Sequence, residues 1–298
     1  MGRHLEWERD AHDWPNREAS CFVQAAGMRW HVQVMGQGPA ILLLHGTGAS
    51  THSFGALMRL LASDFTLIAP DLPGQGFTQQ PPREFLSLPG MARAIASLLR
   101  ALDFRPQIAA GHSAGAAVAI QMTLSRLIAP RAIVSLNGAL LPLGGVAGQI
   151  FAPLAKLFTA IPLVPDLFAR RARDPQAIER MIAQTGSRLD AKGVDFYRRL
   201  ASDPGHVAAA LGMMAHWDLR SFASLLPRLN VPLTLVVGMQ DRTIPPSQAE
   251  QVHEILPQAK IVRLEGLGHL AHEERPDLCA AAIREAGREA GIVAAGAS

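Results

Sequence analysis

The sequence predicts an α/β fold, with a mostly parallel central sheet, helices on both of its faces and an inserted helical cap. Short apolar runs alternate with helical patterns through most of the 298 residues, which is typical of βαβ units. Several of these runs are continuously apolar, as expected for strands buried on both faces. The alternation stops over residues 137–230, where every segment has a helical pattern. We therefore expect a core of residues 1–136 and 231–298 and a cap of residues 137–230.

The first part of the chain predicts an edge ribbon followed by two buried strands. Residues 1–20 form a polar arm with Trp7 and Trp14, which either lies over the body through its tryptophans or is partly loose. Turn residues and alternating hydrophobicity predict two strands that pair antiparallel at one edge of the sheet, residues 22–24 and 28–35. Buried strands are expected at 41–44 and 65–69, and a helix of about ten residues begins near Ser53.

The remaining elements are bounded by proline, glycine and capping residues. Helices are predicted over residues 87–102, from residue 113 to Pro130, over 246–256 and from near Pro276. Strands are predicted at 108–110, 132–136, 231–238 and 260–264. Within the cap, Asp174, Asp190 and Asp203 have the pattern of helix N-caps, and Gly186 has that of a helix stop.

The motif Gly111-His112-Ser113-Ala114-Gly115 lies between a predicted strand and an alanine-rich helix. A G-x-S-x-G motif in this context predicts a nucleophile elbow, a strained turn that presents the serine hydroxyl above the edge of the sheet. Glycine is needed at 111 and 115 because a Cβ atom there would clash with neighbouring elements. The helix N-terminus at Ser113 would stabilise developing negative charge. The flanking strand and helix favour this interpretation over a structural Gly-Ser turn.

A serine nucleophile needs a base and an orienting acid, and both are expected at the ends of later strands. His269 follows the last predicted strand, and Asp241 follows the strand before it. The chain order Ser113, Asp241, His269 is the order expected of α/β hydrolases. Two alternatives concern single residues. Asp241 could instead cap the helix that follows, and His272 lies close enough in sequence to compete with His269.

Further candidates surround the predicted nucleophile. The oxyanion hole requires backbone N–H donors, and we expect them from Ala114 and from Thr47, with Gly48 as the next choice. Asp71 is expected to tie its own loop by hydrogen bonds rather than to act as a nucleophile. Candidate pocket residues come from loops at the strand ends and from the cap: His45, Gly48, His112, Phe151, Met214 and Trp217. His45 also has a simpler interpretation as a structural loop residue, and His112 as the variable position of the elbow.

Composition narrows the class of protein and its partners. With 49% hydrophobic and 18% charged residues, the chain is expected to be globular rather than disordered. A net charge of +3 spread along the chain does not indicate nucleic-acid binding. Cys21 and Cys279 are far apart and no secretory signal is recognisable, which favours a cytoplasmic location. Because the sequence has neither a metal-binding motif nor a dinucleotide-binding loop, we expect no metal and no cofactor.

The elbow, His45-Gly46-Thr47-Gly48 and Gly268-His269 together resemble the α/β-hydrolase superfamily over nearly the whole chain, so an α/β-hydrolase fold is expected. A narrower resemblance, to the magnesium-chelatase accessory hydrolases of bacteriochlorophyll biosynthesis in photosynthetic bacteria, rests on residues 13–20, 30–36, 45–53 and 268–274. By position, this resemblance assigns the triad to Ser113, Asp241 and His269. One departure is Gln75, where many relatives carry a larger or basic residue, and we expect it to have little effect on the chemistry.

These observations predict a serine hydrolase that forms an acyl-enzyme on a hydrophobic carbonyl substrate. The resemblance implies a role near the magnesium-chelatase step and a tetrapyrrole ester as one candidate substrate. It leaves open a non-catalytic accessory protein that binds a porphyrin or the chelatase. A carbon–carbon bond hydrolase or a cofactor-free haloperoxidase-like enzyme would use the same nucleophile. The apolar cap and its arginines at 170, 171 and 173 also suit contact with the chelatase, or peripheral contact with a membrane surface.

Overall fold

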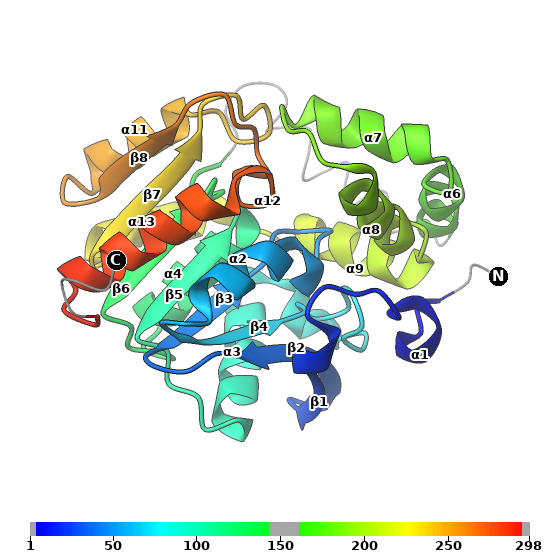
Figure 1. The fold of residues 1–298 in the computed structure, drawn as a ribbon, viewed down its shortest axis with the longest axis horizontal. Coiled ribbons are helices and arrows are strands. Elements are labelled where there is room, and N and C mark those ends of the chain that lie inside the picture. The colour runs from blue at the N-terminus through cyan, green and yellow to red at the C-terminus, as the bar shows by residue number, and fades with distance from the viewer. Residues whose placement is uncertain (1–3, 143–160, 162, 294–298) are drawn as a thin grey trace.

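The computed structural model describes residues 4–142, 161 and 163–293, and its centre is a sheet of eight strands in the order β1-β2-β4-β3-β5-β6-β7-β8 (Figure 1). From β4 to β8 in this order the neighbouring strands are parallel, whereas β2 is antiparallel to both of its neighbours. The strands are β1 (Ser20–Ala25), β2 (Met28–Met35), β3 (Ala40–Leu44), β4 (Thr66–Pro70), β5 (Ile108–His112), β6 (Ala132–Leu136), β7 (Leu233–Gly238) and β8 (Lys260–Leu264). This topology confirms the predicted fold class and the antiparallel edge ribbon.

Four strands begin at other residues than predicted: β3 and β4 are shifted by one residue, and β1 and β7 by two. The two larger shifts each have a local reason. β1 begins at Ser20, two residues early, because Ser20 pairs with Gln33 of β2. β7 begins at Leu233 rather than at residue 231, because Pro232 has no N–H to donate to the ladder.

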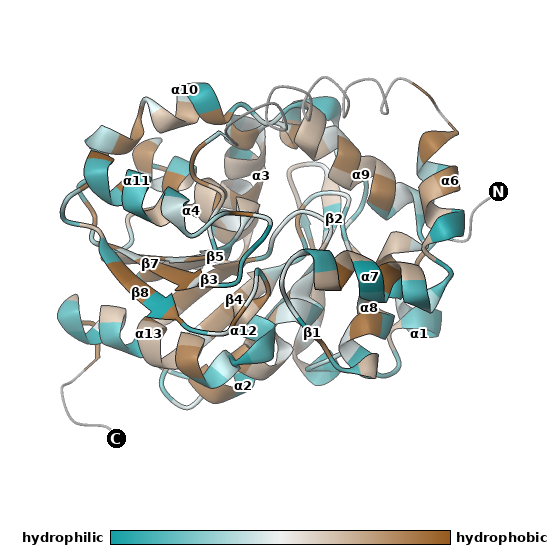
Figure 2. Cartoon of the chain, turned by 90° about the horizontal axis from the view of Figure 1, so that it is seen from above, coloured by the Kyte–Doolittle hydropathy of each residue, from teal (hydrophilic) through white to brown (hydrophobic). Residues whose placement is uncertain are grey.

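Alternate side chains of the buried strands pack against helices on opposite faces of the sheet, as the two-residue period of a strand requires. Leu42 and Leu44 belong to the core beneath one set of helices, and Ile41 and Leu43 to the core beneath the other. The first set is α3 (Leu88–Ala101), α4 (Ala114–Leu124) and α11 (Ser247–Ile255), and the second is α2 (Gly55–Leu61) and α13 (Pro276–Glu289). Figure 2 shows hydrophobic strands between helices whose outward turns are hydrophilic.

The residues that the structure describes between β6 and β7 include five α-helices: α6 (Val164–Arg171), α7 (Pro175–Gln184), α8 (Ala191–Ala201), α9 (Pro204–Ala215) and α10 (Leu219–Ala223). The three predicted helix N-caps are confirmed, since the side chains of Asp174, Asp190 and Asp203 accept backbone N–H groups at the starts of α7, α8 and α9. Gly186 follows α7 with a φ of 85°. The predicted pocket residue Phe151 falls outside the described residues.

The N-terminal arm lies over the body, which was one of the two expected outcomes. α1 (Trp7–Asp10) places Trp7 against Phe22 and His31, and Trp14 is buried and donates a hydrogen bond to Thr51 Oγ1. The short elements complete the described chain: η1 (Arg17–Ala19), η2 (Thr51–Phe54), η3 (Arg83–Leu86), η4 (Leu226–Arg228) and α12 (Ala271–Glu274).

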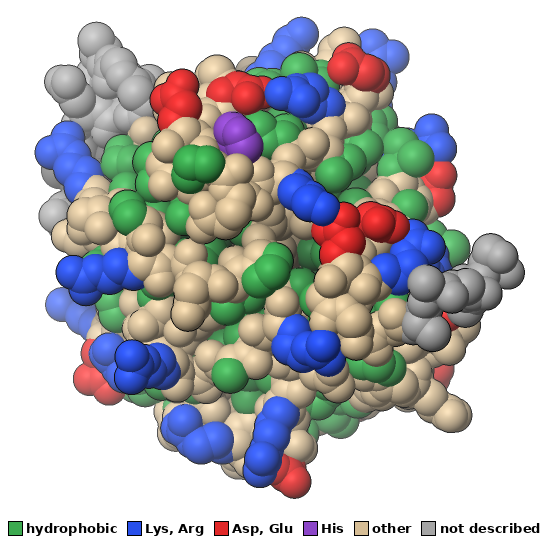
Figure 3. Space-filling view, turned by 90° about the vertical axis from the view of Figure 1, so that its left-hand side faces the viewer, with side chains coloured by type: hydrophobic (Ala, Val, Ile, Leu, Met, Phe, Trp, Pro, Cys, Tyr) green, Lys and Arg blue, Asp and Glu red, His purple; other side chains and the backbone are tan. Residues whose placement is uncertain are grey.

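Charged side chains of both signs are interspersed with hydrophobic ones on the face of the molecule shown in Figure 3. The basic residues on this face are dispersed rather than gathered into one band. Among the helices in the described part of the chain, none has the length and hydrophobicity needed to cross a membrane.

Candidate active site

The predicted elbow has the geometry that its sequence requires. Ser113 lies between β5 and α4 with φ 51° and ψ −118°, a strained conformation for a residue with a side chain. A Cβ atom on Gly115 would lie 2.1 Å from the backbone oxygen of Leu44, and one on Gly111 would lie 2.3 Å from the backbone of Gly115. The two glycines therefore let the strand, the turn and the helix approach this closely.

The predicted acid and base are joined by a hydrogen bond. His269 Nδ1 lies 2.7 Å from Asp241 Oδ2, and both side chains are buried. Because an ionised carboxylate only accepts, His269 donates from Nδ1, which leaves Nε2 free to accept a proton. The alternative base, His272, is fully buried, and neither of its ring nitrogens has a hydrogen-bond partner among the described residues.

Four donors surround the carboxylate of Asp241. Oδ1 accepts from the backbone N–H groups of Thr243 (2.7 Å) and Ile244 (2.9 Å), and Oδ2 accepts from Asn137 Nδ2 (2.8 Å) as well as from His269. Asp241 thus caps the turn that follows it without being the N-cap of α11, so the alternative interpretation describes only half of its contacts. Sequence reasoning missed Asn137; the available signal was a polar residue directly after β6, at the same edge of the sheet.

His112 contacts the predicted base, a contact that the sequence did not predict. Its Nε2 donates to the backbone oxygen of His269 at 3.0 Å, and the two rings lie 4.7 Å apart. Burial and the nearby histidines lower the pKa of His112 well below its usual value, so its ring is neutral. His112 therefore ties the elbow directly to the loop that carries His269.

Replacing His112 with phenylalanine should lower kcat roughly 10- to 100-fold, because the carbonyl of His269 loses its donor and a small misplacement of a base is costly. The matched control is His272→Phe. The His272 ring is buried, and its centroid lies 4.2 Å from that of His112. Because the His272 ring nitrogens make no hydrogen bond in the described chain, kcat should change by less than about twofold. Equal losses in both variants, measured by ester hydrolysis, would show that packing and not the hydrogen bond matters.

The N–H groups predicted for the oxyanion hole are available on two residues and occupied on the third. Ala114 begins α4, and within the described chain neither its N–H nor that of Thr47 has a backbone partner. The N–H of Gly48 donates instead to Gln75 Oε1 at 2.7 Å. Gly48 is therefore not free to serve as the second donor in this conformation.

A cavity of about 1380 Å³ lies between the strand ends and the inserted helices, and Ser113 and His269 both line it. Most of its walls are apolar side chains from α7, α9 and the loops around them. Four predicted pocket residues line the cavity: Gly48, His112, Met214 and Trp217. His45 does not, which corrects that prediction. It is buried in its loop, where Nε2 accepts the N–H of Leu72 and Nδ1 faces the oxygen of Gly46.

Ser113 Oγ has no hydrogen bond to His269 or to another described residue, so the complete triad stays a prediction. Catalytic hydrogen bonds are commonly long or misaligned without substrate and tighten when it binds. Among the described residues, no group of three or more His, Cys, Asp or Glu side chains is placed to hold a metal ion.

Comparison with known proteins agrees with the fold described above. A family described as "Alpha/beta hydrolase family" matches residues 41–282. The "Magnesium-chelatase 30 kDa subunit" of Rhodobacter capsulatus is 37% identical over 267 residues, which cover 89% of this chain and 93% of that protein. A thermophilic esterase from Thermogutta terrifontis aligns with a TM-score of 0.70 at 25% identity, over 91% of this chain and 98% of the esterase. An alpha/beta hydrolase fold protein from Burkholderia ambifaria gives 0.76 at 22% identity, over 96% and 100% of the two chains.

Proposed function

The chain belongs to the alpha/beta hydrolase family, and from this premise we propose that it is a serine hydrolase with Ser113, His269 and Asp241 as its triad. The observation that carries the proposal is the Asp241–His269 hydrogen bond beside a cavity that Ser113 also lines. A strained serine, a base whose tautomer is set by a carboxylate and two unpaired amides are the parts that acyl transfer needs.

In the proposed reaction, Ser113 Oγ attacks the carbonyl carbon of an ester while His269 Nε2 takes the hydroxyl proton. The negative charge that develops on the carbonyl oxygen is stabilised by the N–H groups of Thr47 and Ala114 and by the N-terminus of α4. His269 then gives its proton to the leaving alcohol, and an acyl-enzyme forms. Water, activated by the same imidazole, releases the acid and restores Ser113.

The substrate class follows from the cavity. Its volume of about 1380 Å³ exceeds the usual range for small-molecule sites, about 300–1000 Å³, and its walls are mostly apolar. We infer a bulky hydrophobic ester or related carbonyl compound. The name of the Rhodobacter capsulatus relative supports a place near the magnesium-chelatase step, which makes a tetrapyrrole ester one candidate. The same name supports a second candidate function, an accessory protein that contacts the chelatase without catalysis.

A fluorophosphonate probe tests the proposed nucleophile directly. The native chain should take up one phosphonyl group per molecule, and tandem mass spectrometry should place it on Ser113, because only an activated serine reacts quickly. The heat-denatured chain is the control and should stay unlabelled. An intact native chain without an adduct, or with the adduct on another serine, contradicts the assignment.

A further inference from the structure

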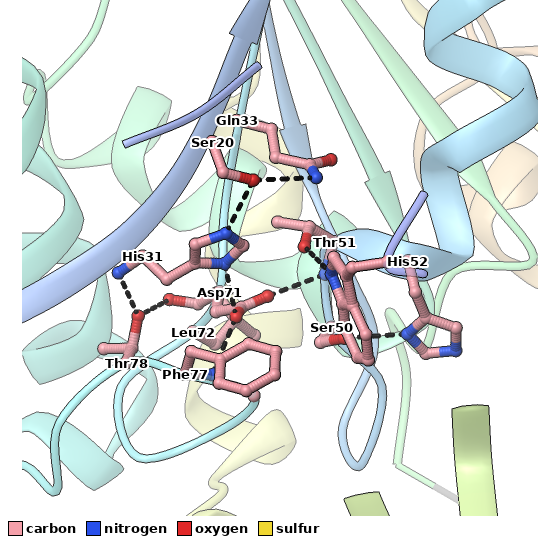
Figure 4. Close-up of polar contacts among 12 residues, drawn as sticks. Ser20, His31, Gln33, Ser50, Thr51, His52, Asp71, Leu72, Phe77 and Thr78 are labelled. Carbon is pink, nitrogen blue, oxygen red and sulfur yellow. Dashed lines mark hydrogen bonds and ion pairs between the residues drawn. The ribbon is translucent and has the colours of Figure 1, made fainter. Parts of the chain in front are cut away.

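Asp71 joins three segments of the chain in a buried hydrogen-bond network (Figure 4). The residue is fully buried, and its Oδ1 accepts the N–H of Thr51 at 2.7 Å. Its Oδ2 lies 2.8 Å from His31 Nδ1 and accepts the N–H of Phe77 at 2.9 Å. Asp71 therefore ties its own loop, as predicted, and also links β2 to the segment that follows β3.

The network has the same order of groups as a catalytic triad, but its serine lies neither in a strained turn nor at the large cavity. His31 Nε2 lies 3.0 Å from Ser20 Oγ, so acid, imidazole and hydroxyl form a chain. Ser20 has an ordinary extended backbone, φ −82° and ψ 136°, and does not line the large cavity. Trp7 packs over the ring of His31 with 4.6 Å between ring centroids. This arrangement fits a fixed support for Asp71 better than a second nucleophile.

What Asp71 and its neighbours support is the loop of residues 45–51, which carries the predicted oxyanion donor Thr47. Besides the bond from Thr51 to Asp71, the N–H of Leu72 donates to His45 Nε2 at 2.8 Å. In the middle of the loop, Gly48 donates its N–H to Gln75 Oε1. Both ends and the middle of this loop are therefore held from residues 71–75.

A fourth contact runs through α9. His206 Nε2 donates to the backbone oxygen of Gly48 at 3.1 Å, and His206 Nδ1 accepts the N–H of Gly76 at 3.0 Å. With Gln75 on its N–H and His206 on its oxygen, Gly48 is held on both sides, directly after Thr47. Gly76 has a φ of 56°, and a Cβ atom there would lie 2.2 Å from Asp71 Oδ2, so glycine is required where the loop of residues 71–77 folds back on Asp71.

We propose that the loop of residues 71–77 holds the oxyanion hole in position, with Gln75 and His31 as positioning residues for Thr47. The inference rests on the proposed serine-hydrolase function. Gln75 acts through Gly48, and His31 acts through Asp71 and Thr51. An oxyanion hole works because its donors are held in place before the reaction, so loosening the loop weakens transition-state binding more than substrate binding.

The test compares Gln75→Leu with Gln80→Leu. Gln80 is an exposed residue three positions beyond this loop, and its side chain donates to the oxygen of Gly74. For Gln75→Leu, kcat per fluorophosphonate-titrated site should fall about tenfold, with KM changed by less than about twofold, since loss of a whole donor costs about 10²–10³. Gln80→Leu should match the native chain. An unchanged kcat per titrated site in Gln75→Leu overturns the proposal.

Two further measurements separate positioning from stability and from the function itself. Hydrogen exchange of the peptide that contains Thr47 and Gly48 should quicken in Gln75→Leu and not in Gln80→Leu; equal exchange overturns the proposal even where activity is low. His31→Asn, whose amide can replace Nδ1 as donor to Asp71, should keep more kcat than His31→Leu, and equal losses would remove His31 from the proposal. If the fluorophosphonate does not label Ser113 in the native chain, the proposed function itself is contradicted, independently of the role of the loop.

Discussion

Replacing Ser113 with alanine should lower kcat for a p-nitrophenyl ester by about 10⁴- to 10⁶-fold. Ser113 supplies the attacking oxygen. Neither its neighbour Ala114 nor the proposed base His269 carries a hydroxyl group that could take its place. Alanine has a Cβ like serine, so the backbone strain at φ 51° is similar and the elbow should keep its shape. Initial rates of the variant and the native chain, each normalised to folded protein by circular dichroism, give the ratio.

Ser125→Ala is the matched control, because Ser125 follows α4 at its opposite end and accepts a hydrogen bond only from Gln121 in the described chain. Its kcat should equal that of the native chain. A Ser113→Ala chain that keeps a tenth or more of the native rate would exclude Ser113 as the nucleophile. In a pigment-producing strain, loss of bacteriochlorophyll with this variant would favour catalysis, and normal pigment would favour the accessory role.

The parts of the fold and site that lie in short motifs could be predicted from the sequence. A G-x-S-x-G elbow forms from five consecutive residues, and its glycines are needed because of contacts with the adjoining strand and helix. Asp241 and His269 could be predicted because parallel strands bring their carboxyl ends to one edge of the sheet. The N-caps Asp174, Asp190 and Asp203 depend on contacts within three residues, so these predictions also hold.

The supporting contacts could not be predicted, because they join residues that are far apart in the chain. Asn137 reaches Asp241 across 104 residues, and His206 reaches Gly48 across 158. The residues next to Asn137 or His206 in the sequence give no pattern from which the hydrogen-bond partner could be predicted. The sequence interpretation expected the departure at Gln75 to have little effect on the chemistry, and no local pattern indicated that this side chain is fully buried and accepts the N–H of Gly48.

The environment of Asp241 determines what an amide in its place would do. Its Oδ1 faces two backbone N–H groups, from Thr243 and Ile244, which have no freedom to turn away. Its Oδ2 faces Asn137 and His269, which can both adapt: Asn137 Oδ1 is buried without a partner in the described chain and can be turned inward, and His269 can change tautomer. In Asp241→Asn the new oxygen should therefore face the backbone and the new NH₂ group should face His269.

That orientation makes Asp241→Asn the second most damaging change expected. The amide donates to His269 Nδ1 and drives the proton to Nε2, so the imidazole can no longer accept the hydroxyl proton of Ser113, and kcat should fall by about 10³- to 10⁴-fold. Nitrogen NMR of His269 should report the proton on Nε2, and KM should change little. Asp190→Asn is the control, since asparagine also caps a helix and should leave kcat unchanged. Native-like turnover with the proton still on Nδ1 would mean that Asp241 does not select the tautomer.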